Sequence, residues 1–223
     1  MSVICWDFDG TLVYSNPLWS NSVYIALKET DSRVKVKFED VRVRMAKGFT
    51  WHTPYENNDE LTDDKWWDFM MNKIYNDYLY LGVDKYTAKS ASRKVPLVIK
   101  RKENYTLYPD SIKVLEKSVY KGNKNILLSN NYPDLTDVLD DLNLTKYFDY
   151  IIISAKVGYD KPRKEIFDIA KNLYPTEEYI MIGDSENADI IGGKNSGMKT
   201  VLVHNGFSDK ADYCIDNLSD FKF

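Results

Sequence analysis

Four polar groups in the sequence each follow a short apolar run, and their residue types suit phosphoryl transfer. They are Asp7 with Asp9, Ser129 with Asn130, Lys161, and Asp184 with Asp189. Carboxylates supply nucleophiles, general acids and oxygen ligands for hard cations, whereas hydroxyl and ammonium groups bind anions. A nucleophilic aspartate, a second carboxylate, a hydroxyl, a lysine and a divalent cation together meet the needs of transfer through an aspartyl-phosphate.

The first group combines two carboxylates with a glycine. Asp7 and Asp9 lie two residues apart, so their side chains share a face in an extended chain. Gly10 permits a sharp turn that exposes backbone N–H groups to an anion. Taken alone, Asp9-Gly10 is equally typical of a hairpin turn. An EF-hand does not fit, because Gly10 would be its fourth residue instead of its sixth, and the sequence has no P-loop motif.

The second and third groups offer anion-binding atoms. Ser129 supplies a hydroxyl and, with Asn130, backbone donors, although Ser-Asn-Asn-Tyr-Pro is also ordinary turn sequence. Lys161 precedes Pro162, which favours an extended backbone at the lysine. Its ammonium group would neutralise a phosphate or clustered carboxylates, whereas an isolated surface lysine is usually solvated.

The fourth group is an aspartate pair. Asp184 follows an apolar run, and Asp189 comes five residues later. A helix N-cap and an exposed helix residue would explain either aspartate alone. Carboxylates that converge on one crevice repel each other unless a cation lies between them, and oxygen ligands with open positions favour Mg²⁺.

The elements that position these residues follow from the apolar pattern. Continuous apolar runs, typical of strands buried on both faces, occur at 3–6, 126–128, 151–153, 180–182 and 201–203. Helical spacing separates the later runs, at 135–142, 165–173 and 188–196. This alternation predicts an α/β fold with a Rossmann-like parallel sheet, whose strands bind ligands at their carboxyl ends. Pro109 is predicted to open a further helix with Ile112, Leu115 and Val119 on one face.

A segment of different character interrupts this pattern. Helical spacing occurs at 20–28, 40–47 and 61–81, and the last has a broad apolar stripe with Trp66, Trp67, Met70, Ile74, Tyr78 and Leu81. We therefore predict an α/β core of residues 1–13 and 97–223 and an inserted helical cap of residues 14–96. The basic stretch 95–107 is predicted to be an irregular join that forms one side of a hinge.

Composition excludes several classes of protein. The chain has 223 residues, of which 43% are hydrophobic and 14% aromatic, so a general disordered state is excluded. The net charge of −4 is a poor match to nucleic acid, and no apolar run approaches the length of a membrane span. Two cysteines make no disulfide framework, and Cys5 is predicted to be a small buried hydrophobe. Without a signal segment, the expected location is cytoplasmic.

The four groups together resemble the motifs of the haloacid dehalogenase-like (HAD) hydrolase superfamily, in its helical-cap phosphatase type. They occur in the family's order as Asp7-Phe8-Asp9-Gly10-Thr11-Leu12-Val13, Leu128-Ser129-Asn130, Lys161-Pro162 and Gly183-Asp184-Ser185-Glu186-Asn187-Ala188-Asp189. The resemblance covers the core, while the cap is similar only in position and helical character. The chain departs from the family at Arg163 and Lys164, where an Asp or Ser followed by Pro is common.

The resemblance implies a Mg²⁺-dependent phosphatase that hydrolyses a small phosphomonoester, of the nucleotide, phosphoglycolate or sugar phosphate class. It implies that Asp7 is the nucleophile and a metal ligand. Asp9 would be the general acid and base, with its backbone carbonyl on the metal. Asp184 would complete the metal ligands, and Asp189 would support the site.

The same resemblance assigns Ser129, Asn130 and Lys161 to the substrate phosphate. A phosphomutase uses the same motifs and stays open, as does a non-catalytic phospholigand-binding protein on this fold. A dehalogenase would lack the second carboxylate of the first motif and the metal, so Asp9 argues against it. The partner would be a small phosphorylated metabolite, and the chain a monomer or homodimer.

The cap is the part of the chain with a basic excess, and it is expected to select the leaving group. Residues 14–104 contain 16 basic and 13 acidic side chains. The most suggestive cluster for substrate recognition is Arg42, Arg44, Lys47, Trp51 and His52, although a solvated helix face followed by a partly buried aromatic residue would also explain most of it.

Overall fold

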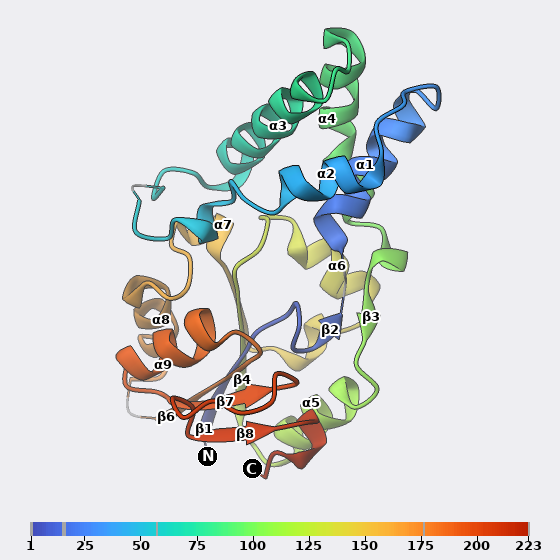
Figure 1. Ribbon diagram of the computed structural model, residues 1–223. Coiled ribbons are helices and arrows are strands. Elements are labelled where there is room, and N and C mark those ends of the chain that lie inside the picture. Colours follow the sequence, from blue (N-terminus) through green and yellow to red (C-terminus); the bar gives the residue numbers. More distant parts are fainter. Residues whose placement is uncertain (1, 15–16, 57, 176, 223) are drawn as a thin grey trace.

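A six-stranded parallel sheet forms the centre of the core. The computed structural model describes residues 2–14, 17–56, 58–175 and 177–222. The strand order is β5-β4-β1-β6-β7-β8 (Figure 1). The strands are β1 (Ser2–Trp6), β4 (Lys124–Ser129), β5 (Tyr150–Ile153), β6 (Glu178–Gly183), β7 (Lys199–Val203) and β8 (Tyr213–Ile215). The predicted α/β class and all five predicted strands are confirmed, and β8 is an additional short edge strand.

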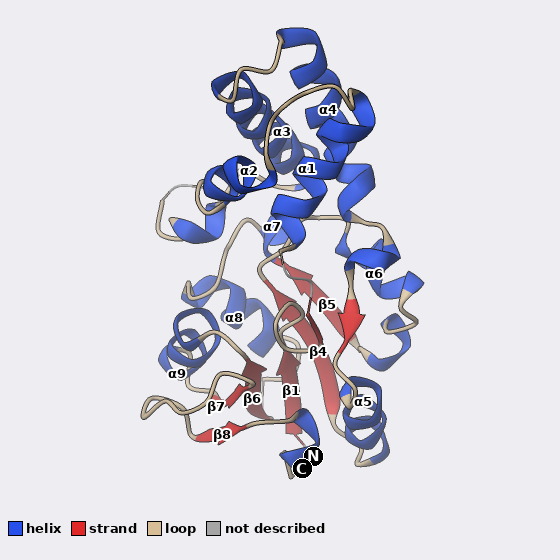
Figure 2. Cartoon of the chain, turned by 45° about the vertical axis from the view of Figure 1, so that its right-hand side comes forward, coloured by secondary structure: helices blue, strands red, loops and turns tan. Residues whose placement is uncertain are grey.

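Helices cover both faces of this sheet. On one side lie α8 (Lys164–Lys171) and α9 (Gly192–Asn195), and on the other lie α5 (Ser111–Tyr120) and α6 (Leu135–Asp141) (Figure 2). Alternate residues of β1 enter the two hydrophobic clusters, with Cys5 in one and Trp6 in the other. Cys5 is fully buried, which confirms the predicted small buried hydrophobe, and this burial raises the pKa of its thiol to about 12.

The buried face of α5 differs from the prediction. Ile112 and Val119 are 37% and 50% exposed, whereas Val114 and Leu115 are buried. The helix also buries two serines, because each hydroxyl finds a partner inside the core. Ser111 Oγ donates to the carbonyl of Leu12, and Ser118 Oγ donates to Asn125 Oδ1. The prediction was therefore right for Leu115 and wrong for Ile112 and Val119, because a count of apolar residues treats such serines as exposed to solvent.

Four helices form a second layer above the carboxyl ends of the strands (Figure 1). They are α1 (Leu18–Thr30), α2 (Phe38–Met45), α3 (Asp63–Tyr80) and α4 (Lys85–Ile99). The predicted stripe of α3 is confirmed, and α2 begins two residues before the predicted segment 40–47. α4 continues through Pro96, so the prediction of an irregular chain was wrong for residues 95–99. The predicted boundary between 96 and 97 falls within this helix.

The chain passes between core and helical layer beside a two-stranded ribbon. β2 (Val13–Tyr14) pairs antiparallel with β3 (Thr106–Leu107), with Val13 opposite Leu107. Outgoing and returning segments therefore run side by side. The short helix α7 (Ser154–Val157) follows β5 on the core side. Among the described residues, no helix has the length and apolar character needed to cross a bilayer.

Candidate active site

The predicted site residues meet at the edge of the sheet that faces the helical layer. Asp7 directly follows β1, and its backbone N–H donates to the carbonyl of Ile182 in β6. Ser129 is the buried last residue of β4, whose Leu127 lies opposite Trp6 of β1. This register carries Ser129 past the end of β1, to the same edge as the Asp7 segment. The parallel sheet thus gathers residues that are distant in the sequence.

Lys161 connects two of the aspartates. Its Nζ lies 3.0 Å from Asp7 Oδ1 and 2.6 Å from Asp189 Oδ1, and its side chain is only 1% exposed. Burial alone would lower the pKa of this lysine, but Asp189 and Asp7 outweigh that effect and raise it. The lysine is therefore a fixed positive charge beside the predicted nucleophile.

Asp184 completes a group of three carboxylates. One carboxylate oxygen from each of Asp7, Asp184 and Asp189 lies within 4.8 Å of the others. Asn205 Nδ2 donates to the backbone carbonyl of Asp184 at 2.5 Å. Gly10 lies against the same aspartate with a φ of +77°, and a side chain at this position would overlap the Asp184 carboxylate. The glycine is therefore needed both for its backbone conformation and for space.

The charges of this group do not balance within the protein. Burial raises the pKa of Asp184 to about 7, and the neighbouring Asp7 and Asp189 add to the effect. Burial also raises the pKa of Asp189, which Lys161 partly offsets. When all three carboxylates are ionised, a single ammonium group leaves an excess of two negative charges. A hard divalent cation with oxygen ligands would supply the missing charge, so the donor set fits Mg²⁺.

Asn130 holds the backbone of Lys161 with both ends of its side-chain amide. Its Oδ1 accepts from the N–H of Lys161 at 2.7 Å, and its Nδ2 donates to the carbonyl of Lys161 at 2.9 Å. This pair of hydrogen bonds fixes the segment after α7 to the end of β4. The side chain of Asn130 thus positions the lysine, while its backbone is the part that stays available for the predicted phosphate contact.

Asp9 is not part of the three-carboxylate group, and its side chain is held by a different partner. Its Oδ2 accepts a 2.7 Å hydrogen bond from Asn131 Nδ2. Asn131 is held in turn, because its Oδ1 accepts from the N–H of Tyr132 and its own N–H donates to Ser154 Oγ. The carboxylate of Asp9 is therefore oriented by a buried residue with a fixed conformation.

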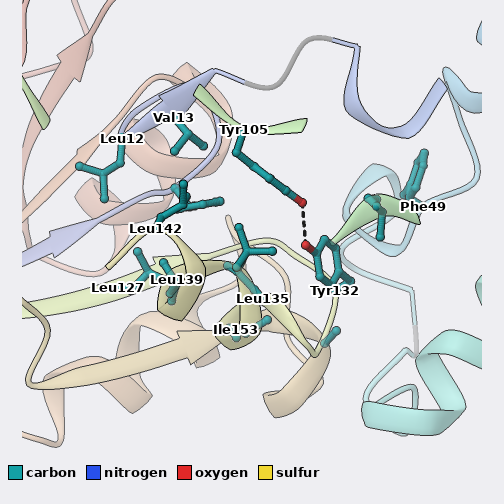
Figure 3. Close-up of a cluster of buried hydrophobic side chains, with 14 of the residues drawn as sticks. Leu12, Val13, Phe49, Tyr105, Leu127, Tyr132, Leu135, Leu139, Leu142 and Ile153 are labelled. Carbon is teal, nitrogen blue, oxygen red and sulfur yellow. Dashed lines mark hydrogen bonds between the residues drawn. The ribbon is translucent and has the colours of Figure 1, made fainter. Parts of the chain in front are cut away.

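Tyr132, the residue after Asn131, forms a buried hydrogen bond with a second tyrosine. The phenol oxygens of Tyr105 and Tyr132 lie 2.6 Å apart, as Figure 3 shows. Burial raises the pKa of both phenols. Tyr105 comes immediately before β3, so this contact joins the site to the ribbon at the base of the helical layer.

A cavity of about 240 Å³ opens beside Asp9 between the two layers. Its described lining consists of Asp9, Leu18, Trp19, Trp51, Asn130 and Asn131. The core contributes the polar wall and the helical layer the apolar wall. The predicted general acid is therefore in contact with the space that a leaving group would occupy.

The residues of the predicted recognition cluster in the cap do not all lie at the cavity. Trp51 lines the cavity, but Arg44 pairs with Asp77 at 2.5 Å and stacks on Tyr80. Arg42 pairs with Glu39 on the surface. Lys47 and His52 are exposed and do not line the described cavity.

Sequence reasoning missed three residues of the site. Asn131 stood next to a predicted site residue but was not given a role. Asn205 follows β7 closely, at the same edge as the other site residues, and the rule about strand ends would have found it. Nothing in the sequence marks Trp19 as a site residue, because an aromatic residue in a helix is usually part of a hydrophobic core.

The parallel sheet, the acidic group at its carboxyl edge and the helical insertion after the first strand define a capped α/β protein. The family model described as haloacid dehalogenase-like hydrolase matches residues 1–197, and the chain belongs to this family.

Several known proteins are similar to parts of the chain or to its fold. Pyrimidine 5'-nucleotidase YjjG of Escherichia coli is 35% identical over 104 residues, which are 44% of this chain and 45% of that protein. Phosphoserine phosphatase of Thermus thermophilus is 31% identical over 110 residues, 48% of this chain and 44% of that protein. The chain thus spans less than half the length of these curated relatives.

Two solved structures share the fold at low sequence identity. YfnB from Bacillus subtilis, in a crystal form bound to magnesium, has a TM-score of 0.76 at 18% identity and covers 98% of this chain and 96% of its own. The 2-haloacid dehalogenase from Pseudomonas syringae pv. Tomato has a TM-score of 0.71 at 18% identity, with coverage of 99% and 96%.

Proposed function

We propose that this chain hydrolyses a small phosphomonoester with the help of Mg²⁺, through an aspartyl-phosphate on Asp7. The observation that carries the proposal is the contact of Lys161 with both Asp7 and Asp189, inside a group of three carboxylates that has excess negative charge. A purely structural ion pair would need one carboxylate. The phosphomonoester-cleaving activities in the names of the two relatives also support the proposal.

In the first step, a carboxylate oxygen of Asp7 attacks phosphorus and the bond to the leaving oxygen breaks. Asp9, held by Asn131, gives its proton to that oxygen, so the leaving group departs as a neutral alcohol. Lys161 offsets the charge on the transferred group, with Ser129 and the backbone of Asn130 as further donors.

In the second step, the carboxylate of Asp9 takes a proton from water. The resulting hydroxide attacks phosphorus, the bond to Asp7 breaks, and phosphate is released. Asp7 and Asp184 would be side-chain ligands of Mg²⁺, Asp9 would add its backbone carbonyl, and Asp189 lies close enough to orient them. When bound, the cation withdraws charge from the phosphate oxygens.

The experiment is a phosphate-release assay with acetyl phosphate and a panel of phosphomonoesters. Asp7→Asn should abolish turnover, because an amide is not a nucleophile, while Asp9→Asn should slow it severely with little effect on substrate binding. Near wild-type rates in purified Asp7→Asn, with contamination excluded, would contradict the mechanism.

A second arm tests the phosphate contacts. Beryllium fluoride with Mg²⁺ should inhibit by imitating a phosphoryl group on Asp7. Ser129→Ala and Lys161→Ala should both weaken this inhibition, and unchanged inhibition would remove these residues from the phosphate site. The cytoplasmic location and a monomeric or homodimeric state stay predictions.

A further inference from the structure

The cavity beside Asp9 lies where the leaving group must be. In the proposed reaction Asp9 protonates the leaving oxygen, so the rest of that alcohol extends from Asp9 away from the phosphate. The described cavity is lined by Asp9 and Asn131 on the core and by Leu18, Trp19 and Trp51 on the helical layer. Its lining therefore determines which leaving groups fit.

The helical wall of this cavity is built from aromatic rings. Trp51 is stacked on Phe49, with 4.6 Å between ring centroids and an interplanar angle of 12°. Trp19 packs against Phe49 at 4.8 Å. The buried ring of Trp66 is nearly parallel to Trp51, with 6.1 Å between ring centroids and an interplanar angle of 22°, and it lies 6.0 Å from Trp19. Because each indole is held by other rings, the wall is rigid and suits a flat partner.

Positive charge is missing from the described lining, which contains no lysine or arginine. Nearby cations are engaged elsewhere. Lys161 is buried between Asp7 and Asp189, Arg163 pairs with Asp59 and Glu165, and Arg44 pairs with Asp77. A leaving group with its own carboxylate or second phosphate would lose water there without gaining an ion pair.

Hydrogen-bonding capacity is also limited in this wall. The amide of Asn131 is engaged with Asp9 and Tyr132, and that of Asn130 with the backbone of Lys161. The other described walls are a leucine and two indoles. Sugar hydroxyl groups therefore gain little on this surface, and a sugar phosphate without a flat ring has nothing to stack on the two indoles.

We propose that Trp19 and Trp51 bind a flat, uncharged ring in the leaving group, so that the preferred substrates are nucleoside 5'-monophosphates. Phosphorylated carboxylic acids and simple sugar phosphates are disfavoured. This inference rests on the proposed function, because it takes Asp9 as the acid beside the leaving oxygen. Stacking between a base and an aromatic side chain is strong enough to change selectivity by about 10-fold.

The test compares kcat/KM for uridine 5'-monophosphate, ribose 5-phosphate, phosphoglycolate and acetyl phosphate. Wild-type protein should prefer uridine 5'-monophosphate to ribose 5-phosphate and phosphoglycolate by about 10-fold or more. Trp51→Leu should lower the ratio of uridine 5'-monophosphate to acetyl phosphate by about 10-fold, whereas Trp51→Phe should keep most of it. The matched control is Tyr86→Leu, an exposed aromatic residue of α4 outside this cavity, which should leave the ratio unchanged.

Wild-type protein alone provides a measurement that does not depend on variant folding. Uridine should inhibit acetyl phosphate hydrolysis at concentrations where ribose does not. Equal or better turnover of ribose 5-phosphate or phosphoglycolate, or no inhibition by uridine, would overturn this inference while acetyl phosphate hydrolysis upholds the proposed function. Failure to hydrolyse acetyl phosphate or any ester in the panel would contradict the proposed function itself.

Discussion

Asn131 Nδ2 donates a 2.7 Å hydrogen bond to Asp9 Oδ2, and it is the contact that aims the predicted general acid at the cavity. Asn131 is buried and is itself fixed by Tyr132 and Ser154. The orientation of Asp9 thus depends on a residue that has no part of its own in bond making or breaking.

The first prediction follows from this contact. Asn131→Ala should lower kcat/KM, which reports the steps up to loss of the leaving group, by about 10-fold or more for alkyl phosphates, whose leaving oxygen needs a proton. The effect on p-nitrophenyl phosphate should be much smaller, because its leaving group departs without protonation. Steady-state kinetics with both substrates checks this, and Asn76→Ala on the exposed side of α3 is the control. An equal fall for both substrates would indicate a structural role only.

The second prediction concerns the metal. Chelation should remove activity and Mg²⁺ should restore it, whereas Ca²⁺ should support it poorly because its looser coordination misplaces phosphate and nucleophile. Asp184→Ala should raise the Mg²⁺ concentration needed for half-maximal rate or abolish turnover. Titration of activity with Mg²⁺ measures this. Full activity in excess chelator would contradict the three-carboxylate site.

The third prediction separates two cap arginines. Arg44→Ala leaves the buried carboxylate of Asp77 with Lys73 as its remaining ion-pair partner among the described residues, so it should destabilise the protein by about 1.5–3 kcal/mol. Arg42→Ala removes only a surface pair whose side chains are 64% and 70% exposed, and should change stability by less than about 0.5 kcal/mol. Denaturant unfolding compares them. Altered substrate ranking in Arg44→Ala without lost stability would restore the arginine to substrate recognition.

The fourth prediction is a pH dependence at the contact between the two layers. Asp160 is buried, and its Oδ1 has no hydrogen-bond partner within the described part of the chain. Burial raises its pKa above 3.8, while the hydroxyls of Ser154 and Thr50 and the charges of Arg163 and Lys161 offset part of the shift. Since the folded-state pKa is raised, this carboxyl favours folding below its unfolded pKa and opposes it as the pH rises.

Asp160→Asn removes the buried carboxylate whose ionisation opposes folding at neutral and higher pH. Its melting temperature should exceed that of wild type at about pH 8, and the difference should shrink as the pH falls toward about 4. Differential scanning calorimetry across this range measures the effect. A difference that grows toward acid pH would show that Asp160 has a lowered pKa in the folded protein.

The sequence predicted the fold best in segments where the residue types themselves indicate the surroundings, as in an apolar run that must be buried. The strands of the core are continuous apolar runs, and the catalytic candidates follow them, so the parallel sheet alone predicts that Asp7 and Asp184 approach each other. The predicted face of α5 failed because Ser118 is buried through a bond to Asn125, a partner seven residues away that periodicity does not report.

The other wrong or missing predictions concern contacts between residues that are distant in the sequence. Arg44 was a candidate for substrate recognition or for a solvated helix face, but it pairs with Asp77 in another helix, and nothing in the residues around Arg44 indicates that pairing. The basic stretch 95–107 was predicted to be irregular, yet α4 continues to Ile99 because its buried face includes Val95 and Val98. The role of Asn131 depends on the conformation of Asp9, which only the folded chain defines.

The ribbon of β2 and β3 is a suitable place to replace the helical segment with another one. Tyr14 and Thr106 are paired neighbours. The chain therefore leaves the core for the helical layer, and returns from it, at the same place. A segment from another protein whose ends lie a strand's spacing apart can be grafted there without moving any strand of the six-stranded sheet. If the helical layer sets selectivity as proposed, replacing this one continuous segment should change the preferred leaving group and leave the residues of the core edge in place.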